Sequence, residues 1–510
     1  MKKSGAFRVA AALLGMALPA LSADLYTSDR EVAIRTPADH TLATEWLANE
    51  LGPVREASDC VLVRRLYLDL VGRLPSVEEA RNFVRSQDPG KYEVLADALL
   101  ADDGFVAYWS MRFGEMLRVK SEFPINLWPN AVYVYMRRIR EFLHNDEPYH
   151  EFVRELLLSG GSNFRDAPVN FYRAHADRSP RGIAGNVAST LCGIRLETLP
   201  ESEQQAWTRI FEEIGFKNTK EWKEEVVYLK KLPPRDIVLP DGKHVAVPEG
   251  GEARRLLADH LTRGDGRKIL ARSMVNRTWR WFFGAGLARV SEEEPGNPEL
   301  LEMLTDEFVR NGFHFRQLCR AIVTGAAYRS ASFQDNAAAK ARHFAAYPVR
   351  RLEAEVLDDA LADLTGVSSR YSSVIPEPFT FIPQEMRTVE IADGSISSSF
   401  LILFGRPSRD AGTPDERNDR INAKQRLFLF NSGALYRRLS RIPRRPEFRN
   451  KPVGKQLEQL YWMFYSRPPT PEESRAVMKR YRAVPPKNRW RFFNDLVWTM
   501  VNSAEFLHRH

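Results

Sequence analysis

Residues Leu66–Arg81 read LYLDLVGRLPSVEEAR, and residues Leu460–Arg475, near the other end of the chain, read LYWMFYSRPPTPEESR. The two stretches share a Leu-Tyr pair at the start, a proline in the middle, and an acidic pair followed by a small residue and an arginine at the end. This internal repeat is the most informative feature of the sequence, because each copy also contains the signals that start a helix.

Both copies contain a complete helix-capping signal. Ser76 and Thr470 stand where a hydroxyl can accept a hydrogen bond from the first free N–H groups of a helix. Glu79 and Glu473, three positions further on, can bond back to the capping residue. Pro471 occupies a first helical position, where its missing N–H costs nothing. The repeat therefore predicts a helix–turn–helix near each end of a mainly α protein.

The rest of the chain predicts further helices, one β-hairpin and one long loop. Lys217–Lys231 is rich in lysine and glutamate, which predicts a solvated helix. Pro240–Lys243 (PDGK) lies between two short β-prone runs and predicts a hairpin at the junction of two domains. Gly366–Phe400 predicts a long surface loop, a kind of segment that is often functional. Apolar spacing predicts helices over Thr41–Leu51, Tyr92–Leu100, Val132–Leu143, Tyr149–Leu158, Arg181–Leu191, Arg267–Phe283, Pro298–Asn311, Phe315–Thr324, Leu352–Leu361 and Gln425–Ser440.

The start of the chain predicts export. Lys2, Lys3 and Arg8 precede a short apolar run, Val9–Leu21, and small residues follow it. This pattern is typical of a secretory signal peptide, with an uncleaved anchor as the alternative. No later stretch is apolar enough to suggest a membrane span. The predicted organisation is a signal peptide (1–22), an N-terminal extension (23–55), a first helical domain (56–216), a linker with the hairpin (217–252) and a second helical domain (253–510).

The composition excludes several classes of protein. Charged residues make up 27% and hydrophobic residues 44%, as in ordinary soluble proteins. Three distant cysteines do not make a disulfide framework, although a Cys60–Cys192 bridge remains an alternative to buried free thiols. The ten histidines lack metal-ligand spacing, so no metal site is predicted. No G-x-S-x-G element supplies a hydrolase serine.

The net charge of +8 is concentrated in one stretch. A run of this kind attracts polyanions such as acidic glycans, and the alternative is a solvated face balanced by acids elsewhere in the fold. Predicted export argues against nucleic acid as the partner. The basic residues are Arg420, Lys424, Arg426, Arg437, Arg438, Arg441, Arg444, Arg445, Arg449, Lys451 and Lys455, with Glu447 as the acid among them.

The segment before this run is the candidate site. Its two parts read FGRPSRD (404–410) and DERNDR (415–420). Arginine side chains in such an irregular segment can bind carboxylate or sulfate with forked geometry, and the alternative is that Arg–Asp pairs fasten the loop to the following helix. The predicted ligand-binding residues are Arg406, Arg409, Asp410, Asp415, Glu416, Arg417 and Arg420.

Several blocks together resemble two paired families of exported planctomycete proteins. The first half resembles planctomycete-specific cytochrome domain two, and the second half is similar to planctomycete-specific domain one. The resemblance implies an exported, mostly helical protein of unestablished activity, often encoded beside sulfatase-like exported proteins. The matching blocks are RRLYLDLVGRLP (64–75), NDEPYHEFV (145–153), NFY (170–172), VNR (275–277), FGAGL (283–287), YR (328–329), RRLEAE (350–355) and FGRP (404–407).

The chain departs from the first family at its haem-attachment element. Many members carry C-x-x-C-H after the stretch that here reads LCGIRL (191–196), whereas this chain continues with ETLPES (197–202). Cysteine is also common in the second family where Thr413 and Pro414 stand. Covalent haem needs two thiols and a histidine ligand, so we expect no haem and no other cofactor.

These observations favour an exported non-haem scaffold or binding protein that holds an acidic or sulfated glycan or a sulfatase-like exported partner. The alternative is a polysaccharide-acting hydrolase that uses Asp410, Asp415 and Glu416. A third reading, redox function through the three cysteines, has the least support. The sequence leaves open whether the protein is an enzyme.

Overall fold

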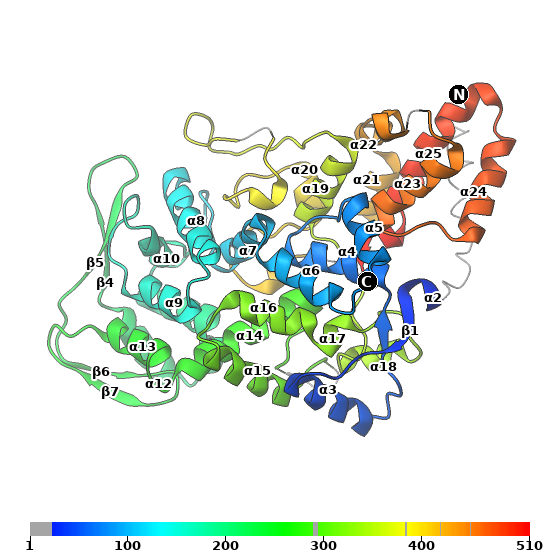
Figure 1. Cartoon of the computed structure of the whole chain (residues 1–510). Helices are drawn as coiled ribbons and strands as arrows, with labels where there is room; N and C mark the ends of the chain where they lie inside the picture. Colours follow the sequence, from blue (N-terminus) through cyan, green and yellow to red (C-terminus); the bar gives the residue numbers. More distant parts are fainter. Residues whose placement is uncertain (1–22, 289–293, 383–384, 419, 449) are drawn as a thin grey trace.

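The structure is a computed structural model that describes residues 23–288, 294–382, 385–418, 420–448 and 450–510 (Figure 1). The predicted signal peptide (1–22), Asp419 of the candidate site and Arg449 of the basic run lie outside these residues. The protein is mainly α, as predicted, with a few short antiparallel strands.

The first half is a series of helices interrupted by three short strands. Its elements are α2 Ala23–Tyr26, β1 Thr27–Glu31, α3 Pro37–Ala48, β2 Arg55–Ala57, α4 Asp59–Leu70, α5 Val77–Arg85, α6 Lys91–Leu100, α7 Asp103–Met116, α8 Pro129–His144, α9 Tyr149–Leu158, β3 Gly161–Ser162, α10 Asn170–Arg173, α11 Pro180–Val187 and α12 Glu201–Phe211.

Four strands join it to a second, almost entirely helical half. These strands are β4 Ile214–Asn218, β5 Glu225–Leu229, β6 Arg235–Val238 and β7 His244–Val247. The second half contains α13 Ala253–Thr262, α14 Arg267–Phe283, α15 Pro298–Arg310, α16 Phe315–Thr324, α17 Ala326–Arg329, α18 Ala337–Arg342, β8 Arg350–Arg351, α19 Ala354–Thr365, α20 Ser399–Leu403, α21 Ala423–Asn431, α22 Gly433–Leu439, α23 Val453–Tyr465, α24 Pro471–Ala483, α25 Arg489–Val501, α26 Ala504–Leu507 and β9 His508–Arg509.

The repeat of capped helices is confirmed. In α5 the Ser76 hydroxyl accepts from the Glu79 N–H at 3.2 Å, and the Glu79 carboxylate accepts from the Ser76 N–H at 2.7 Å. In α24 the corresponding distances for Thr470 and Glu473 are 3.1 and 2.7 Å. Each box satisfies donors that the first turn of a helix otherwise leaves free.

Two predictions of secondary structure are wrong. Residues 217–231 form β4 and β5 rather than a solvated helix, and β5 also pairs with β3 in a sheet of order β3-β5-β4. The β-prone run Val226–Tyr228 outweighs the lysines and glutamates around it, because it pairs on both sides. The predicted helix over Gln425–Ser440 is divided at Ser432, whose hydroxyl caps α22 at 3.2 Å from the Leu435 N–H.

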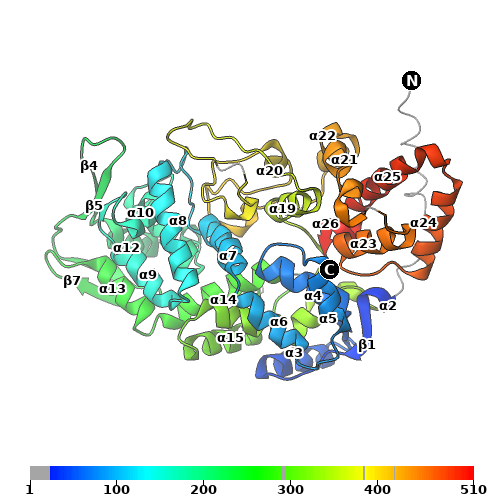
Figure 2. The same cartoon turned by 45° about the horizontal axis from the view of Figure 1, so that its top comes forward.

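The hairpin between the halves is confirmed as β6 and β7, whose pairing runs from Arg235↔Val247 to Val238↔His244. The strands β4–β7 lie at one end of the molecule and α23–α25 at the other (Figures 1 and 2). The C-terminus lies between them beside α4, where the Arg65 Nε donates to the His510 carbonyl at 3.2 Å.

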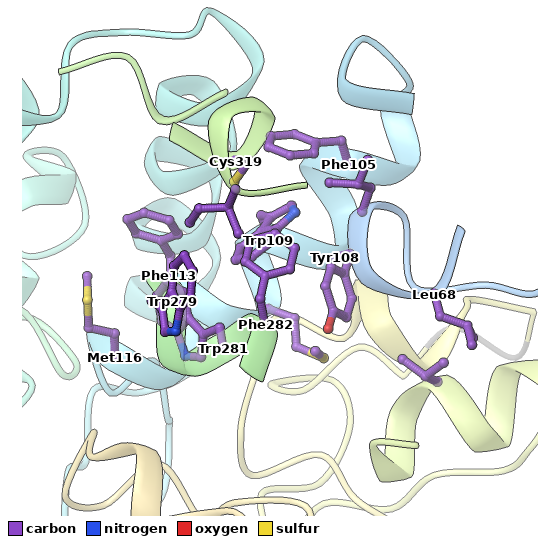
Figure 3. Packing of buried hydrophobic residues seen from close by; sticks show 14 of the residues in the cluster. Leu68, Phe105, Tyr108, Trp109, Phe113, Met116, Trp279, Trp281, Phe282 and Cys319 are labelled. Atoms are coloured by element: carbon purple, nitrogen blue, oxygen red, sulfur yellow. The ribbon is translucent and has the colours of Figure 1, made fainter. Parts of the chain in front are cut away.

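The hydrophobic core runs through both halves. Trp109 and Phe113 of α7 pack against Trp281 of α14, with ring centroids 5.7 and 6.0 Å apart (Figure 3). They also pack against Phe315 of α16, at 5.0 and 5.2 Å. Because α7 belongs to the first half and the other two helices to the second, the halves share buried aromatic surface. Such burial is the main favourable term in folding.

The three cysteines are free thiols. Burial raises the pKa of Cys60 and of Cys192 to about 12, and it raises the pKa of Cys319 as well. Thiols in such surroundings are poor nucleophiles. Among the described residues, no helix is both long and apolar enough to cross a bilayer.

Candidate functional site

The candidate site is a loop organised around one carboxylate. Glu416 accepts hydrogen bonds from the N–H groups of Asp410, Ala411 and Gly412 at 2.8–3.0 Å and from the Ser408 hydroxyl at 2.9 Å. A carboxylate that accepts several backbone donors fixes the shape of a short loop. The loop therefore has a defined conformation without any ligand.

Gly405 closes the base of this loop. It has φ +83°, and a Cβ at this position would stand 2.1 Å from the Asn418 carbonyl oxygen. The Asn418 N–H in turn donates to the Gly405 carbonyl at 3.1 Å. Only glycine permits both the backbone conformation and this approach of the two ends.

Arg409 points into the protein. It has φ +60° and is fully buried, and its guanidinium donates to the carbonyls of Val119 and Ala392 at 3.2 and 2.7 Å. Burial, and after it the neighbouring charge of Arg406, lower the pKa of this guanidinium to about 10. Arg409 thus fastens the loop to the segment that follows α7 and to the long loop 366–400.

Arg406 and Arg417 converge on one buried carboxylate, Glu355 of α19. The distances are 3.2 Å from the Arg406 Nε and 2.7 Å from an Arg417 terminal nitrogen. Arg417 also pairs with Glu115 of α7. Burial alone would raise the pKa of Glu355, but Arg417 and then Arg406 lower it to about 2, so this carboxylate is ionised.

The remaining acids of the predicted site also have partners. Asp410 pairs with Lys120 at 2.6 Å, and Asp415 pairs with Arg280. Together with Glu416, these are the three carboxylates of the predicted hydrolase. In the structure each of these carboxylates is paired with, or hydrogen-bonded to, another group of the protein itself.

The pairs that Arg406 and Arg417 form with Glu355 and Glu115 belong to a longer chain of buried charges, which the sequence did not predict. Acid and base alternate along it from α4 to the candidate loop, each residue paired with the next. We call it the buried charge chain, and its members in order are Asp69, Arg509, Glu353, Arg112, Glu115, Arg417, Glu355 and Arg406. The doublet of acids in RRLEAE (350–355) supplies two of them, but nothing local in the sequence indicates their partners.

Arg420 differs from the other predicted arginines because it is exposed. It begins a region, residues 420–455, that we call the cationic segment. Within the described residues, Arg438, Arg445 and Lys455 pair with Asp358, Glu447 and Glu458. Seven other cations of the segment are exposed and form no ion pair with a described residue: Arg420, Lys424, Arg426, Arg437, Arg441, Arg444 and Lys451.

Two protein families match the chain, in the order that the sequence predicts. PSCyt2, a protein of unknown function (DUF1549), matches residues 37–190, and PSD1, a protein of unknown function (DUF1553), matches residues 253–481. The chain belongs to these paired families. No curated protein and no solved structure matches it. The candidate loop and the cationic segment lie within the PSD1 match.

The PSCyt2 part does not fit a covalently attached haem. Where many family members carry the attachment element, this chain has a short turn, Leu196–Thr198, followed by Pro200 before α12. The preceding Cys192 is buried, and its pKa is raised to about 12. His175 is also buried and lies 3.2 Å from the Asn186 amide. The thiol pair and adjacent histidine that attachment requires are absent from this sequence.

Proposed function

We propose that this protein is an exported, non-haem helical binding protein that holds an acidic polymer, a sulfated glycan above all, on its cationic segment. The observation that carries the proposal is the set of seven exposed cations without an ion pair among the described residues. Unpaired cations of one sign attract polyanions from solution. The resemblance to exported proteins encoded beside sulfatase-like proteins supports sulfate as the charged group.

The buried arginines supply the frame for this surface. Arg406, Arg409 and Arg417 direct their guanidinium groups at carbonyls and carboxylates of the protein itself. We infer that they fix the loop that leads into α21, while direct contact with the ligand falls to exposed residues from Arg420 onward. Glu416 and Asp415 serve the same frame through their own partners.

Apolar side chains stand among the exposed cations. Leu427 and Phe430 of α21 are 59% and 39% exposed. Apolar groups beside cations suit a polymer that presents both sulfate groups and the carbon-bound hydrogens of sugar rings. The partner is therefore a chain that the segment contacts at several points, and its affinity falls as salt screens the charges.

Charge reversal on the cationic segment tests the proposal. In the triple variant Lys424→Glu/Arg426→Glu/Arg437→Glu we expect elution from a heparin column at clearly lower salt than the unchanged protein requires. The control replaces three exposed lysines outside the segment with glutamate: Lys217, Lys231 and Lys243.

The control has the same net charge as the test variant, so it isolates position from total charge. Equal loss of retention in the two variants would mean that net charge alone drives binding. Failure of the unchanged protein to bind heparin at low salt would refute the proposal outright.

A further inference from the structure

A second surface, distant in sequence from the cationic segment, presents aromatic rings to solvent. Trp128, Trp222 and Phe379 come from three separate segments and contact one another, with ring centroids 5.5–6.4 Å apart. The Lys223 ammonium lies 4.8 Å from the centre of the Trp128 ring. We call these four residues the aromatic cluster. Trp222 is 67% exposed and Phe379 47% exposed, although large aromatic side chains normally gain free energy by burial.

The three rings of the aromatic cluster differ in how their planes are inclined to one another. The Trp222 and Phe379 rings are inclined by only 25°, whereas the Trp128 ring meets them at 76° and 56°. Trp128 is half-buried and supports the other two from the side. Two nearly parallel, partly exposed rings therefore lie against one half-buried tryptophan.

Backbone strain is concentrated beneath these rings. Asn126, Trp128, Lys220 and Lys223 all have φ between +60° and +74°. A bulky residue such as tryptophan rarely adopts this conformation, and such residues gather at functional sites because the surrounding structure must hold them there.

Hydrogen bonds to each of the three segments provide that support. Glu122 accepts from the Val374 N–H at 2.9 Å, which joins the Trp128 loop to the Phe379 loop. Asn163 donates to the Lys223 carbonyl at 3.2 Å and accepts from the Glu225 N–H at 2.9 Å, which holds the tip of the β4–β5 hairpin. The rings are thus positioned before any ligand arrives, which reduces the entropy lost on binding.

The charges of the hairpin tip that carries Trp222 balance. The hairpin tip carries Lys220, Glu221, Lys223 and Glu224, two of each sign. Glu224 is engaged by the Ser162 hydroxyl at 2.6 Å, and the Lys223 ammonium by the tryptophan rings. A hairpin tip without net charge adds no attraction to a polyanion or to anionic lipid headgroups. A neutral ligand is the complement of this surface.

We propose that the aromatic cluster binds a neutral polysaccharide built of pyranose rings. One face of a pyranose presents C–H groups, which pack on an aromatic ring, while hydroxyl groups project from its edge. The Trp222 and Phe379 faces accept two sugar rings of one chain, and Lys223 donates to a hydroxyl at the edge. The inference is independent of the proposed function, because the cluster and the cationic segment share no residue.

The test is retention in native gels that contain hydroxyethylcellulose, glucomannan, laminarin or dextran, all neutral. We expect at least one of them to slow the unchanged protein, and we expect Trp222→Ala and Phe379→Ala to lose most of the retardation. Trp222→Phe, which keeps a ring face, should preserve it. The matched control is Tyr228→Ala, because Tyr228 is 43% exposed on the same hairpin but is not part of the cluster.

Salt separates this surface from the cationic segment. Retardation by the neutral polymer should persist when salt is raised from about 0.1 M to about 1 M, a range over which charge–charge attraction is lost. Absence of retardation in all four gels, or equal retardation of Trp222→Ala and the unchanged protein, would overturn the proposal. Self-association that Trp222→Ala abolishes would also overturn it, because a second copy of the chain would then be the occupant.

Discussion

At the scale of single residues, the buried charge chain explains why most of the predicted site lies inside the protein. A guanidinium group can bind a carboxylate of the protein itself with the same two-pronged geometry that it uses for a carboxylate of a ligand. The sequence FGRPSRD identifies residues that need partners, but it does not say whether those partners are internal. Arg417 lies 62 residues after Glu355 in the chain and Arg406 is nearly as distant, so only the fold brings them together.

Arg509 is the residue on which this argument can be tested. It is fully buried and pairs with Asp69 and Glu353, and it lies beyond the PSD1 match. We expect Arg509→Met to lower the free energy of unfolding by about 3–5 kcal/mol, because two buried carboxylates lose their shared cation. Urea unfolding followed by circular dichroism measures the change.

The control for this variant is an arginine whose ion pair is exposed. Arg475 pairs with Glu472 at 2.5 Å, and both side chains are largely exposed. Arg475→Met should change stability by no more than about 1 kcal/mol, because solvent screens such pairs. If Arg509→Met cost no more than this control, the buried charge chain would contribute nothing to stability.

At the scale of elements, the repeat proves more extensive than the capping boxes. Arg73 donates to Glu79 at 2.8 and 2.9 Å, and Arg467 donates to Glu473 at the same two distances. Each arginine also donates to a carbonyl next to it in the chain at 3.1 Å. Each stands over the tyrosine six residues before it. The two turns are thus built in the same way, from the preceding helix to the cap.

Single substitutions at the two caps test whether the copies are equivalent in energy. We expect Ser76→Ala and Thr470→Ala each to lower the free energy of unfolding by about 0.5–2 kcal/mol, because each leaves a backbone donor of the first turn unsatisfied. Equilibrium unfolding in urea gives both values.

Ser474→Ala is the matched control, because Ser474 lies within α24 and alanine has the higher helix propensity. It should leave stability unchanged or raise it slightly. A loss at Ser474 as large as at Thr470 would show that the caps do not account for the effect.

The elements that the sequence predicts well are those whose signals are local. The range Arg267–Phe283 is predicted to the residue as α14, and the hairpin of β6 and β7 follows from its turn. The strands β4 and β5 are missed because β5 gains its stability partly from Gly161 and Ser162 of β3, some sixty residues earlier. Most lysines and glutamates of residues 217–231 lie outside the two strands, and they mask the short apolar run Val226–Tyr228.

At the scale of the whole molecule, charge joins the two family domains. Arg112 and Glu115 belong to the PSCyt2 match, whereas their partners Glu353, just before α19, and Arg417, in the candidate loop, belong to the PSD1 match. Sequence similarity defines each domain by itself, and the division into two domains remains a prediction. The pairs between the two matches couple their stabilities, so the ionisation of a few carboxylates affects the protein as a whole.

Acid should weaken this coupling. Burial would raise the pKa of Glu355 and of Glu353, but their arginine partners overcome burial and lower both, that of Glu355 to about 2. A carboxyl whose pKa is lowered by folding contributes stability above its unfolded pKa, about 4.5, and that stability is lost as the pH falls toward the folded value. The acid limb of the stability curve should therefore lie between about pH 4.5 and pH 2.

Asp359 acts in the opposite direction. It is buried on α19, and burial raises its pKa to about 7 even though Arg387 and the N–H groups of Thr388 and Val389 favour the charged form. A carboxyl whose pKa is raised by folding is protonated more readily in the folded state, so its contribution to stability falls as the pH rises from the unfolded value to the folded one.

We therefore expect the free energy of unfolding to decline between about pH 5 and pH 7 in the unchanged protein, and to decline less in Asp359→Asn, which does not ionise. Asparagine keeps an acceptor for the Thr388 N–H, so the variant should fold. The measurement is urea unfolding at about pH 3, 5 and 7. The arginine-paired glutamates are intact in both proteins, so both should lose stability between about pH 5 and pH 3. The unchanged protein should lose less than Asp359→Asn there, because the contribution of Asp359 still grows until the pH falls below its unfolded pKa of about 3.9. Parallel curves above pH 5 would show that Asp359 is already ionised in the folded protein, with its backbone donors and Arg387 outweighing the cost of burial.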